Sequence, residues 1–158
     1  MWHSYAPSPI GDLLLVADEE GLVRVEFAGA AAPDDAPRDD NRLAPVLRQL
    51  AEYFGGHRTH FDITLAPRGT PFQLDVWRTL QRIPYGETRS YADVARSIGR
   101  PTATRAVGAA NGANPIPIII PCHRVIGSNG SLTGFGGGMG VKRRLLDLES
   151  GLGFLPMH

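Results

Sequence analysis

The chain has 158 residues, of which 42% are hydrophobic and 20% charged, and its formal net charge is zero. This composition is typical of a globular protein and excludes a disordered, collagen-like or membrane-embedded chain. No apolar run approaches the roughly 20 residues that span a membrane, and the first residues do not resemble a secretion signal, so we expect a cytoplasmic protein without a membrane partner.

The two parts of the chain carry opposite charge. Residues 1–65 hold eleven acidic and five basic side chains, for a net charge of −6, and the remaining residues hold eleven basic and five acidic ones, for +6. A polyanion would therefore meet the second part. The simpler alternative is a solvated surface without a partner, and the charges alone do not decide between the two.

Residues 1–66 are predicted to form a small α+β domain. Residues 13–16 are continuously apolar, and in residues 22–27 apolar and charged side chains alternate after a turn, which predicts a β-hairpin. Apolar residues then recur at helical spacing from Leu43 to Phe54 and stop at two glycines, which predicts an amphipathic helix.

Two further segments complete this domain. Residues 28–40 consist largely of Ala, Pro and Asp without periodicity, and we expect a mobile surface loop there. Residues 61–65 alternate again, which predicts one more strand, and residues 67–71 form the connection to the second domain.

Residues 70–158 are predicted to be mainly helical. A helical face from Phe72 to Leu80 ends before a Pro-Tyr-Gly turn. Ser90 and Asp93 have the spacing of a capping box, which predicts a short helix ending at Gly99. After Arg100-Pro101 a second helix is predicted from residue 102 to about 112, so that two short helices flank a tight turn, as in a helix-turn-helix motif.

The second of these helices has an unusual surface beside Arg105. The sequence Ala106-Val107-Gly108-Ala109-Ala110 offers almost no side chain, so the helix can approach another surface closely. A DNA minor groove, about 6 Å wide, would suit such a face. Many helix pairs of this kind only build a core, and this alternative stays open on the pattern alone.

The single cysteine, Cys122, excludes an internal disulfide. It follows an apolar segment stiffened by prolines and precedes His123 and Arg124. A cationic or hydrogen-bonding neighbour favours the thiolate, which is the nucleophilic form of cysteine, so these two residues could activate the sulfur. In extended backbone adjacent side chains point apart, however, and His123 would then need a water or a bent turn to reach the sulfur. A buried inert cysteine remains the alternative.

The sequence Pro-Cys-His-Arg-Val at residues 121–125, with the glycine-rich segment 134–138, resembles the active-site signature of the O6-alkylguanine-DNA alkyltransferases. The similarity also covers residues 83–88, 90–91, 105–108, 111–112, 114–115 and 126–127, together with Lys142, Leu145, Leu146 and Glu149. It implies an α+β protein in which a small β-sheet and helix lobe of ribonuclease H-like outline (1–66) packs on a helical domain with a winged helix-turn-helix-like DNA-binding motif (70–158).

The resemblance implies a chemical role for four residues. Cys122 would accept the alkyl group, His123 would take the thiol proton through a water, Glu149 would orient the imidazole, and Asn114 would hold the active-site turn. The reaction would be an irreversible, single-turnover transfer from O6-alkylguanine, and by extension O4-alkylthymine, in duplex DNA, with no cofactor, no obligate protein partner and a monomeric protein.

The resemblance also implies a set of substrate-binding and DNA-binding residues. Tyr91 would donate towards the guanine and help to turn the neighbouring phosphate, and Arg105 would fill the gap left when the base flips out. Small residues would allow minor-groove entry with little sequence specificity, and a loop would line the pocket. The complete set is Ser90, Tyr91, Arg105, Ala106, Ala109, Ala110, Pro117, Arg124, Val125, Phe135, Gly136 and Gly137.

The chain departs from the family pattern in two places. Phe135 stands where many members have tyrosine, and Gly136 where some have a hydroxyl residue, so hydrogen bonds to the base change and the pocket's alkyl preference is open. Some relatives bind zinc in the N-terminal lobe, but here that lobe has no cysteine and its His57 and His60 point to opposite faces in a strand, so we expect no metal. Lys142 is expected either to contact the loop or DNA or to be a solvated helix start.

Three other functions compete with alkyl transfer. A noncatalytic lesion binder of the same architecture would carry tryptophan in place of Cys122. A cysteine hydrolase using Cys122 and His123 would turn over repeatedly and would not need the helix pair. A transcription regulator would read the major groove with longer polar side chains than alanine and glycine.

Overall fold

The computed structural model describes residues 1–132, 135 and 137–152. The chain forms two compact units, Met1–Arg68 and Gly69–His158, and each is described by itself. Across the described ranges, no helix combines the length and the apolar character that crossing a membrane requires. Gly136, one of the predicted substrate-binding residues, lies outside the described residues.

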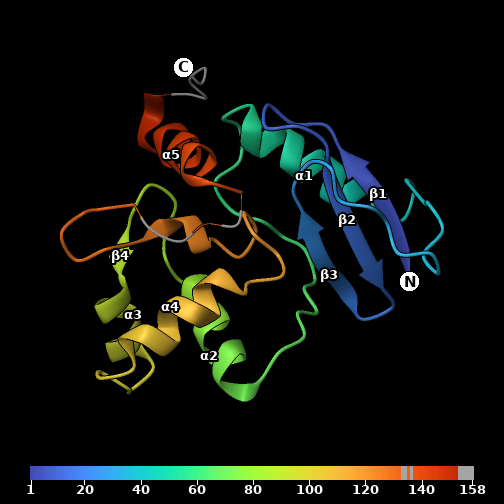
Figure 1. Cartoon of the computed structure of the whole chain (residues 1–158). Coiled ribbons are helices and arrows are strands. Elements are labelled where there is room, and N and C mark those ends of the chain that lie inside the picture. The colour runs from blue at the N-terminus through green and yellow to red at the C-terminus, as the bar shows by residue number, and fades with distance from the viewer. Residues whose placement is uncertain (133–134, 136, 153–158) are drawn as a thin grey trace. The chain divides into compact units, whose positions relative to one another are not determined.

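The first unit is a three-stranded antiparallel sheet with one helix (Figure 1). The strand order is β1-β2-β3, and every residue of the central strand except its last is buried. The β2–β3 hairpin and the helix that ends at the two glycines confirm the prediction, whereas the first strand was not predicted. The elements are β1 (Trp2–Ala6), β2 (Leu13–Asp18), β3 (Gly21–Glu26) and α1 (Ala44–Phe54).

Both edges of this sheet are partly covered by other segments. Along β1, the His3 amide donates to the carbonyl of Pro37, and the Asp39 amide donates to the carbonyl of His3. The prediction of a mobile loop is therefore wrong for its last residues, which pair with the sheet edge. Along β3, Leu22 bridges Leu65, so the strand predicted at 61–65 shrinks to a single bridge.

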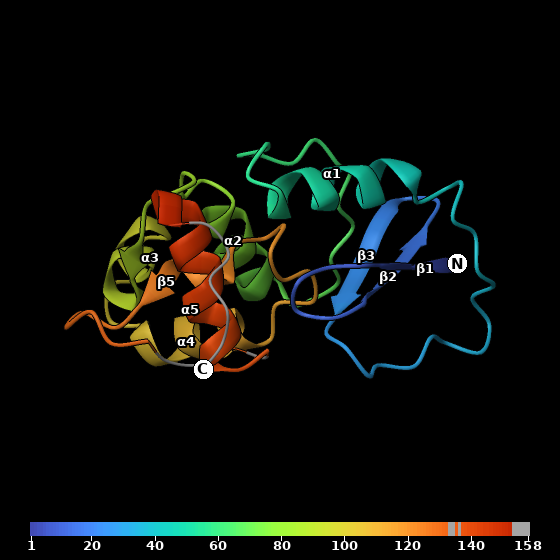
Figure 2. The ribbon, with the colours of Figure 1, turned by 90° about the horizontal axis from the view of Figure 1, so that it is seen from above.

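The second unit consists of helices and one short pair of strands. Helices α2, α3 and α4 pack against one another, and Figures 1 and 2 show α3 and α4 side by side. The indole N–H of the buried Trp77 donates to the Ala110 carbonyl at 2.9 Å and so locks α2 to α4. The elements are α2 (Pro71–Leu80), β4 (Arg89–Ser90), α3 (Tyr91–Ser97), α4 (Thr104–Gly112), the 3₁₀ helix η1 (Cys122–Arg124), β5 (Val125–Ile126), α5 (Met139–Asp147) and the π-helical segment η2 (Leu148–Leu152).

The capping box at the start of α3 is present as predicted. The Ser90 hydroxyl accepts from the Asp93 amide, and the Asp93 carboxylate accepts from the Ser90 amide. Ser90 is also the last residue of β4, which pairs in parallel with β5 directly after η1. The start of α3 and the segment that follows Cys122 are thus held together by backbone hydrogen bonds.

Candidate active site

Cys122 lies at the end of two consecutive tight turns. The Ile120 amide donates to the Ile116 carbonyl at 2.9 Å, and the Cys122 amide donates to the Ile120 carbonyl at 2.7 Å. Pro121 between them has φ −80° and ψ 65°, the conformation of an inverse γ-turn. Cys122 then opens the helix η1, so the backbone around the sulfur is bent, whereas the sequence suggested an extended one.

Two asparagine side chains fix this backbone. The Asn114 amide group donates to the Ile120 carbonyl at 2.8 Å, and its oxygen accepts from the Ile116 amide at 2.9 Å. Asn111, from the end of α4, donates to the Cys122 carbonyl at 3.4 Å. Asn111 was not predicted as a site residue, because only its hydrogen bond, which spans eleven residues, reveals its position. The cysteine is therefore coupled to α4.

The side chains of His123, Glu149 and Arg124 form a buried hydrogen-bonded cluster, which we call the relay. It begins at the residue that follows Cys122 in the chain. His123 Nε2 and Glu149 Oε2 are 2.7 Å apart, and both side chains are almost inaccessible to solvent. Arg124 Nε donates to Glu149 Oε1 at 2.7 Å and Nη2 donates to Oε2 at 3.0 Å, so the carboxylate is held by two partners. The structure brings together His123 and Glu149, as the resemblance implied.

Arg124 requires a correction. It was predicted among the residues that contact substrate or DNA, but it is only 7% exposed. Its guanidinium binds Glu149 with two nitrogens and donates from Nη1 to the Ile83 carbonyl at 2.7 Å. In the bent helix η1 this side chain turns inward with His123, so it supports the carboxylate and does not face the surface.

The electrostatics of the relay follow from burial. Burial alone would raise the pKa of Glu149, but the hydrogen bonds and charges of His123 and Arg124 outweigh it and hold that pKa far below its ordinary value. Burial also lowers the pKa of His123, against the opposing effect of Glu149. The histidine is therefore neutral at neutral pH while the glutamate is ionised.

A neutral histidine bound to a carboxylate through Nε2 carries its proton on that nitrogen. Nδ1 of His123 is then the basic nitrogen, and among the residues that the structure describes it has no hydrogen-bond partner. A buried polar atom without a partner is costly and commonly marks a functional contact. The residue directly after the chain's only cysteine thus carries a nitrogen that is free to accept a proton.

Cys122 itself is 5% exposed. Burial raises the pKa of Cys122, whereas a hydrogen bond from Asn114, the charge of Lys142 and the backbone N–H groups of residues 122 and 123 lower it. The balance keeps the sulfur protonated at rest. These groups favour the thiolate once a base takes the proton, which suits a nucleophile that forms only during reaction.

Lys142 is fully buried, so the prediction of a solvated helix start is wrong. Its ammonium group donates to the Val125 carbonyl at 2.6 Å and thereby holds the first turns of α5 against the segment after η1. Burial lowers the pKa of Lys142, and the neighbouring Cys122 thiolate opposes this shift.

The predicted DNA-facing residues of α4 divide into two groups. Arg105, Ala106 and Ala109 are exposed, whereas Ala110 is buried at 3% and its carbonyl accepts the Trp77 hydrogen bond. The prediction that Ala110 faces DNA is therefore wrong, because this residue lies on the core side of the helix. A methyl group at Gly108 would contact the Tyr91 ring at 3.9 Å, which places α4 close to the first residue of α3.

The remaining predicted residues differ in their exposure to solvent. Pro117 and Val125 are buried, whereas Ser90, Phe135 and Gly137 are partly exposed. Phe135 has an interaction partner, and Ser90 caps α3. Pro117 lies within the first of the two turns before Cys122, and Val125 directly follows η1.

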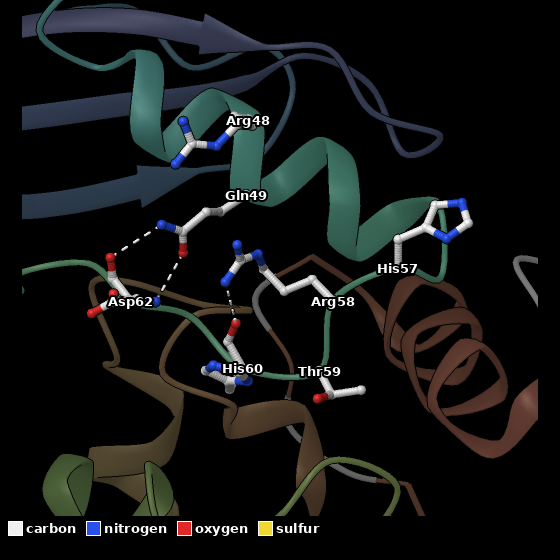
Figure 3. Close-up of a pocket in the computed structure, with 7 residues that line it drawn as sticks. All are labelled: Arg48, Gln49, His57, Arg58, Thr59, His60 and Asp62. Atoms are coloured by element: carbon white, nitrogen blue, oxygen red, sulfur yellow. Dashed lines mark hydrogen bonds between the residues drawn. The ribbon is translucent and has the colours of Figure 1, made fainter.

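The first unit has a separate hollow of about 460 Å³ that contains none of the predicted site residues. Figure 3 shows Gln49 paired with the Asp62 backbone and Arg58 donating to the His60 carbonyl. Its lining residues are Arg48, Gln49, His57, Arg58, Thr59, His60 and Asp62. In the described part of the chain, no cluster of three His, Cys, Asp or Glu side chains has the arrangement of a metal site.

The buried histidine predicts a dependence of stability on pH. Because the pKa of His123 is lowered in the folded state, the unfolded chain binds the extra proton first as the pH falls below 6.5. Stability is therefore complete above this pH and declines below it, by at most about 1.4 kcal/mol per pH unit from this group. Urea unfolding at pH 7.5 and 5.5 measures the loss, and a His123→Gln variant should lose less; an equal loss in both proteins would refute the assignment.

In comparisons with known proteins, both units of the chain match domains of the same kind of protein. Residues 71–151 match the family model described as "6-O-methylguanine DNA methyltransferase, DNA binding domain", and residues 1–67 match its "ribonuclease-like domain". A methylated-DNA–protein-cysteine methyltransferase of Methanosarcina acetivorans is 50% identical over 94% of the chain and 98% of its own length. A constitutive protein of that name from Bacillus subtilis is 42% identical over 94% of both chains.

The fold also matches solved structures. A crystal structure of Mycobacterium tuberculosis OGT in complex with DNA superposes with a TM-score of 0.91 at 46% identity, covering 97% of this chain and 95% of that one. A Methanococcus jannaschii O6-methylguanine DNA methyltransferase superposes with a TM-score of 0.68 at 26% identity over 98% and 97% of the two chains. The α+β architecture with a small sheet and a helical unit is thereby confirmed.

Proposed function

The chain belongs to the 6-O-methylguanine DNA methyltransferase family, and from this premise we propose that it repairs DNA by moving an alkyl group from O6 of a damaged guanine to Cys122. The observation that carries the proposal is the buried set of contacts among His123, Glu149 and Arg124, which begins at the residue after Cys122. His123 is fixed through Nε2 by Glu149 and keeps an unpartnered Nδ1, as a general base requires.

The transfer is a displacement at the alkyl carbon. The thiol proton of Cys122 passes to Nδ1 of His123, directly or through one water, and the sulfur forms a bond to the alkyl carbon as the bond from carbon to guanine O6 breaks. The electron pair stays on the guanine, which takes up a proton from the Tyr91 hydroxyl, and the proton held by His123 then returns the tyrosine to its neutral form through solvent. Glu149 stabilises the imidazolium that forms, and Arg124 keeps Glu149 ionised.

Each molecule acts once. The product is a thioether, which is a poor leaving group, and the chain's only thiol is consumed in forming it. The reaction is therefore stoichiometric and needs no cofactor. Because thiols are kept reduced in the cytoplasm, we place its action there.

Recognition of DNA falls to α3 and α4. Chemistry on a stacked base requires that the base leave the duplex. Arg105 is exposed at the start of α4, and the small exposed residues Ala106 and Ala109 allow the helix to enter a minor groove. Arg105 would occupy the space that the flipped base vacates. Pro117, Val125, Phe135 and Gly137 would line the pocket that receives it.

Removal of Arg105 is expected to slow repair of duplex DNA. Because flipping costs a few kcal/mol, loss of the side chain that fills the gap should lower the transfer rate on duplex substrate about tenfold or more. The effect on a single-stranded substrate should be smaller, since there is no stack to fill. Rates for Arg105→Ala on both substrates measure this difference.

Arg48→Ala is the matched control for a lost surface charge, because the Arg48 side chain is 66% exposed and lies in the first unit. This variant should repair both substrates at the rate of the unmodified protein. An Arg105→Ala protein with equal losses on duplex and single strands would refute the role in base flipping.

Titration of a duplex that contains O6-methylguanine tests the function itself. Digestion and chromatography should show one guanine restored per protein molecule and no more. Binding of the lesion without restoration would indicate the noncatalytic lesion binder. Restoration of several guanines per protein molecule would contradict the single-turnover mechanism.

A further inference from the structure

Ile118 has a backbone conformation that its side chain does not favour. Its φ is +74°, and among the described residues no other non-glycine residue has a positive φ. A branched Cβ collides with the backbone in this left-handed region, so an isoleucine there is strained. Such strain persists only where the surroundings impose it, and it clusters at functional sites.

Contacts of the residues before and after Ile118 impose this backbone conformation. Ile118 is the middle residue of the turn that the Ile120 amide closes onto the Ile116 carbonyl. The side chain of Asn114 holds both ends of this turn, accepting from the Ile116 amide at 2.9 Å and donating to the Ile120 carbonyl at 2.8 Å. The Ile118 side chain is 1% exposed, so it also anchors the turn in the core.

The strained turn is connected directly to the nucleophile. The carbonyl of Ile120 accepts both the Asn114 side chain and, at 2.7 Å, the amide of Cys122. If Ile118 relaxed to a negative φ, the direction of the chain would change two residues before this carbonyl. The Cys122 amide would then lose its acceptor, and the sulfur would move relative to Asn114 and to the backbone N–H groups that favour its thiolate.

We propose that Ile118 is a positioning residue, whose buried side chain and strained backbone, held by Asn114, determine where Cys122 presents its sulfur. Glycine would adopt the same backbone without strain but could not anchor the turn in the core. Isoleucine anchors the turn at the expense of strain, and the Asn114 hydrogen bonds offset that strain. The functional meaning of this inference rests on the proposed role of Cys122 as alkyl acceptor.

The first test compares glycine and alanine at two neighbouring positions. At an ordinary position glycine is less stable than alanine, because it loses more backbone freedom on folding. At residue 118 we expect the reverse order, with the unfolding equilibrium constant of Ile118→Gly about tenfold below that of Ile118→Ala. Ile119, which is 7% exposed and has no positive φ, is the matched control and should show the ordinary order. The ordinary order at both positions would overturn the proposal.

The second test measures coupling between residue 118 and Asn114. Because the chain holds one cysteine, reaction with iodoacetamide followed by mass spectrometry reports on Cys122 alone. Asn114→Ala should move the pH midpoint of this reaction upward in the unmodified and Ile118→Ala backgrounds. The shift should be clearly smaller in the Ile118→Gly background, since glycine adopts the turn conformation without help from the two Asn114 hydrogen bonds. Equal shifts in all three backgrounds would show a purely structural residue and overturn the proposal.

A third measurement needs no substitution at the turn. Cross-correlated relaxation in nuclear magnetic resonance separates positive from negative φ, and it should report a positive φ for Ile118 in the unmodified protein. A negative φ would overturn the proposal even if the glycine and alanine variants failed to fold. None of these readouts uses alkylated DNA, so a protein that never accepts an alkyl group would defeat the proposed function and leave the three results unchanged.

Discussion

Replacing Cys122 by serine is expected to abolish alkyl transfer completely. A hydroxyl group gives up its proton far less readily than a thiol, so the neutral His123 cannot generate a comparable nucleophile. The side chain has nearly the same volume and is 5% exposed, so the fold and the exposed face of α4 should remain intact. Gel-shift titration should show that the variant binds a duplex with O6-methylguanine within about threefold of the unmodified protein.

Two outcomes would distinguish a wrong acceptor assignment from a disturbed structure. A Cys122→Ser protein that still restores guanine would exclude Cys122 as the acceptor. A variant that loses both transfer and DNA binding would show that the substitution disturbed the structure. Urea unfolding of the same variant distinguishes these cases, because a folded protein should keep its unfolding midpoint.

Glu149→Gln is expected to have the second largest effect, on stability and on chemistry together. The substitution leaves the buried Arg124 guanidinium without its anion, which costs about 3–5 kcal/mol of unfolding free energy. It also removes the charge that stabilises the His123 imidazolium, so transfer should slow by about 10²–10⁴. Urea unfolding and single-turnover kinetics measure the two effects separately.

A double variant separates the two roles of this carboxylate. Arg124→Met combined with Glu149→Gln removes both buried charges, and stability should largely return because an ion pair can be replaced by neutral groups. Transfer should stay slow, because His123 still lacks a carboxylate. Glu52→Gln, which breaks only surface pairs with Arg48 and Arg58, is the control and should cost less than about 1 kcal/mol. Full transfer activity in the double variant would contradict the role of Glu149.

Local patterns in the sequence predicted several elements of the fold correctly. The Ser90–Asp93 capping box and the glycines after α1 are short-range signals, and both are present. Strand β1 was not predicted, because its buried face consists of the small residues Ser4 and Ala6, which give no hydrophobic periodicity. The pairing of residues 37–39 with this strand uses only backbone groups, which leave no trace in the side-chain pattern.

In the candidate site, too, the features that depend on neighbouring residues were predictable, and those that depend on contacts with distant residues were not. The motif around Cys122 predicted a nucleophile and its histidine, but not the direction of the Arg124 side chain. That direction depends on η1, where bent backbone turns both His123 and Arg124 towards Glu149, 25 residues further along the chain from Arg124. Ala110 was misplaced for a related reason: the small residues of α4 look alike in sequence, and only the contact with Trp77 shows which of them faces the core.

The most direct test of the central claim is intact-protein mass spectrometry after incubation with a duplex that carries one O6-methylguanine, followed by peptide mapping. We expect a gain of one methylene mass on the peptide that contains Cys122, saturating at one per protein molecule. An unchanged mass under conditions in which the damaged duplex is bound would contradict it.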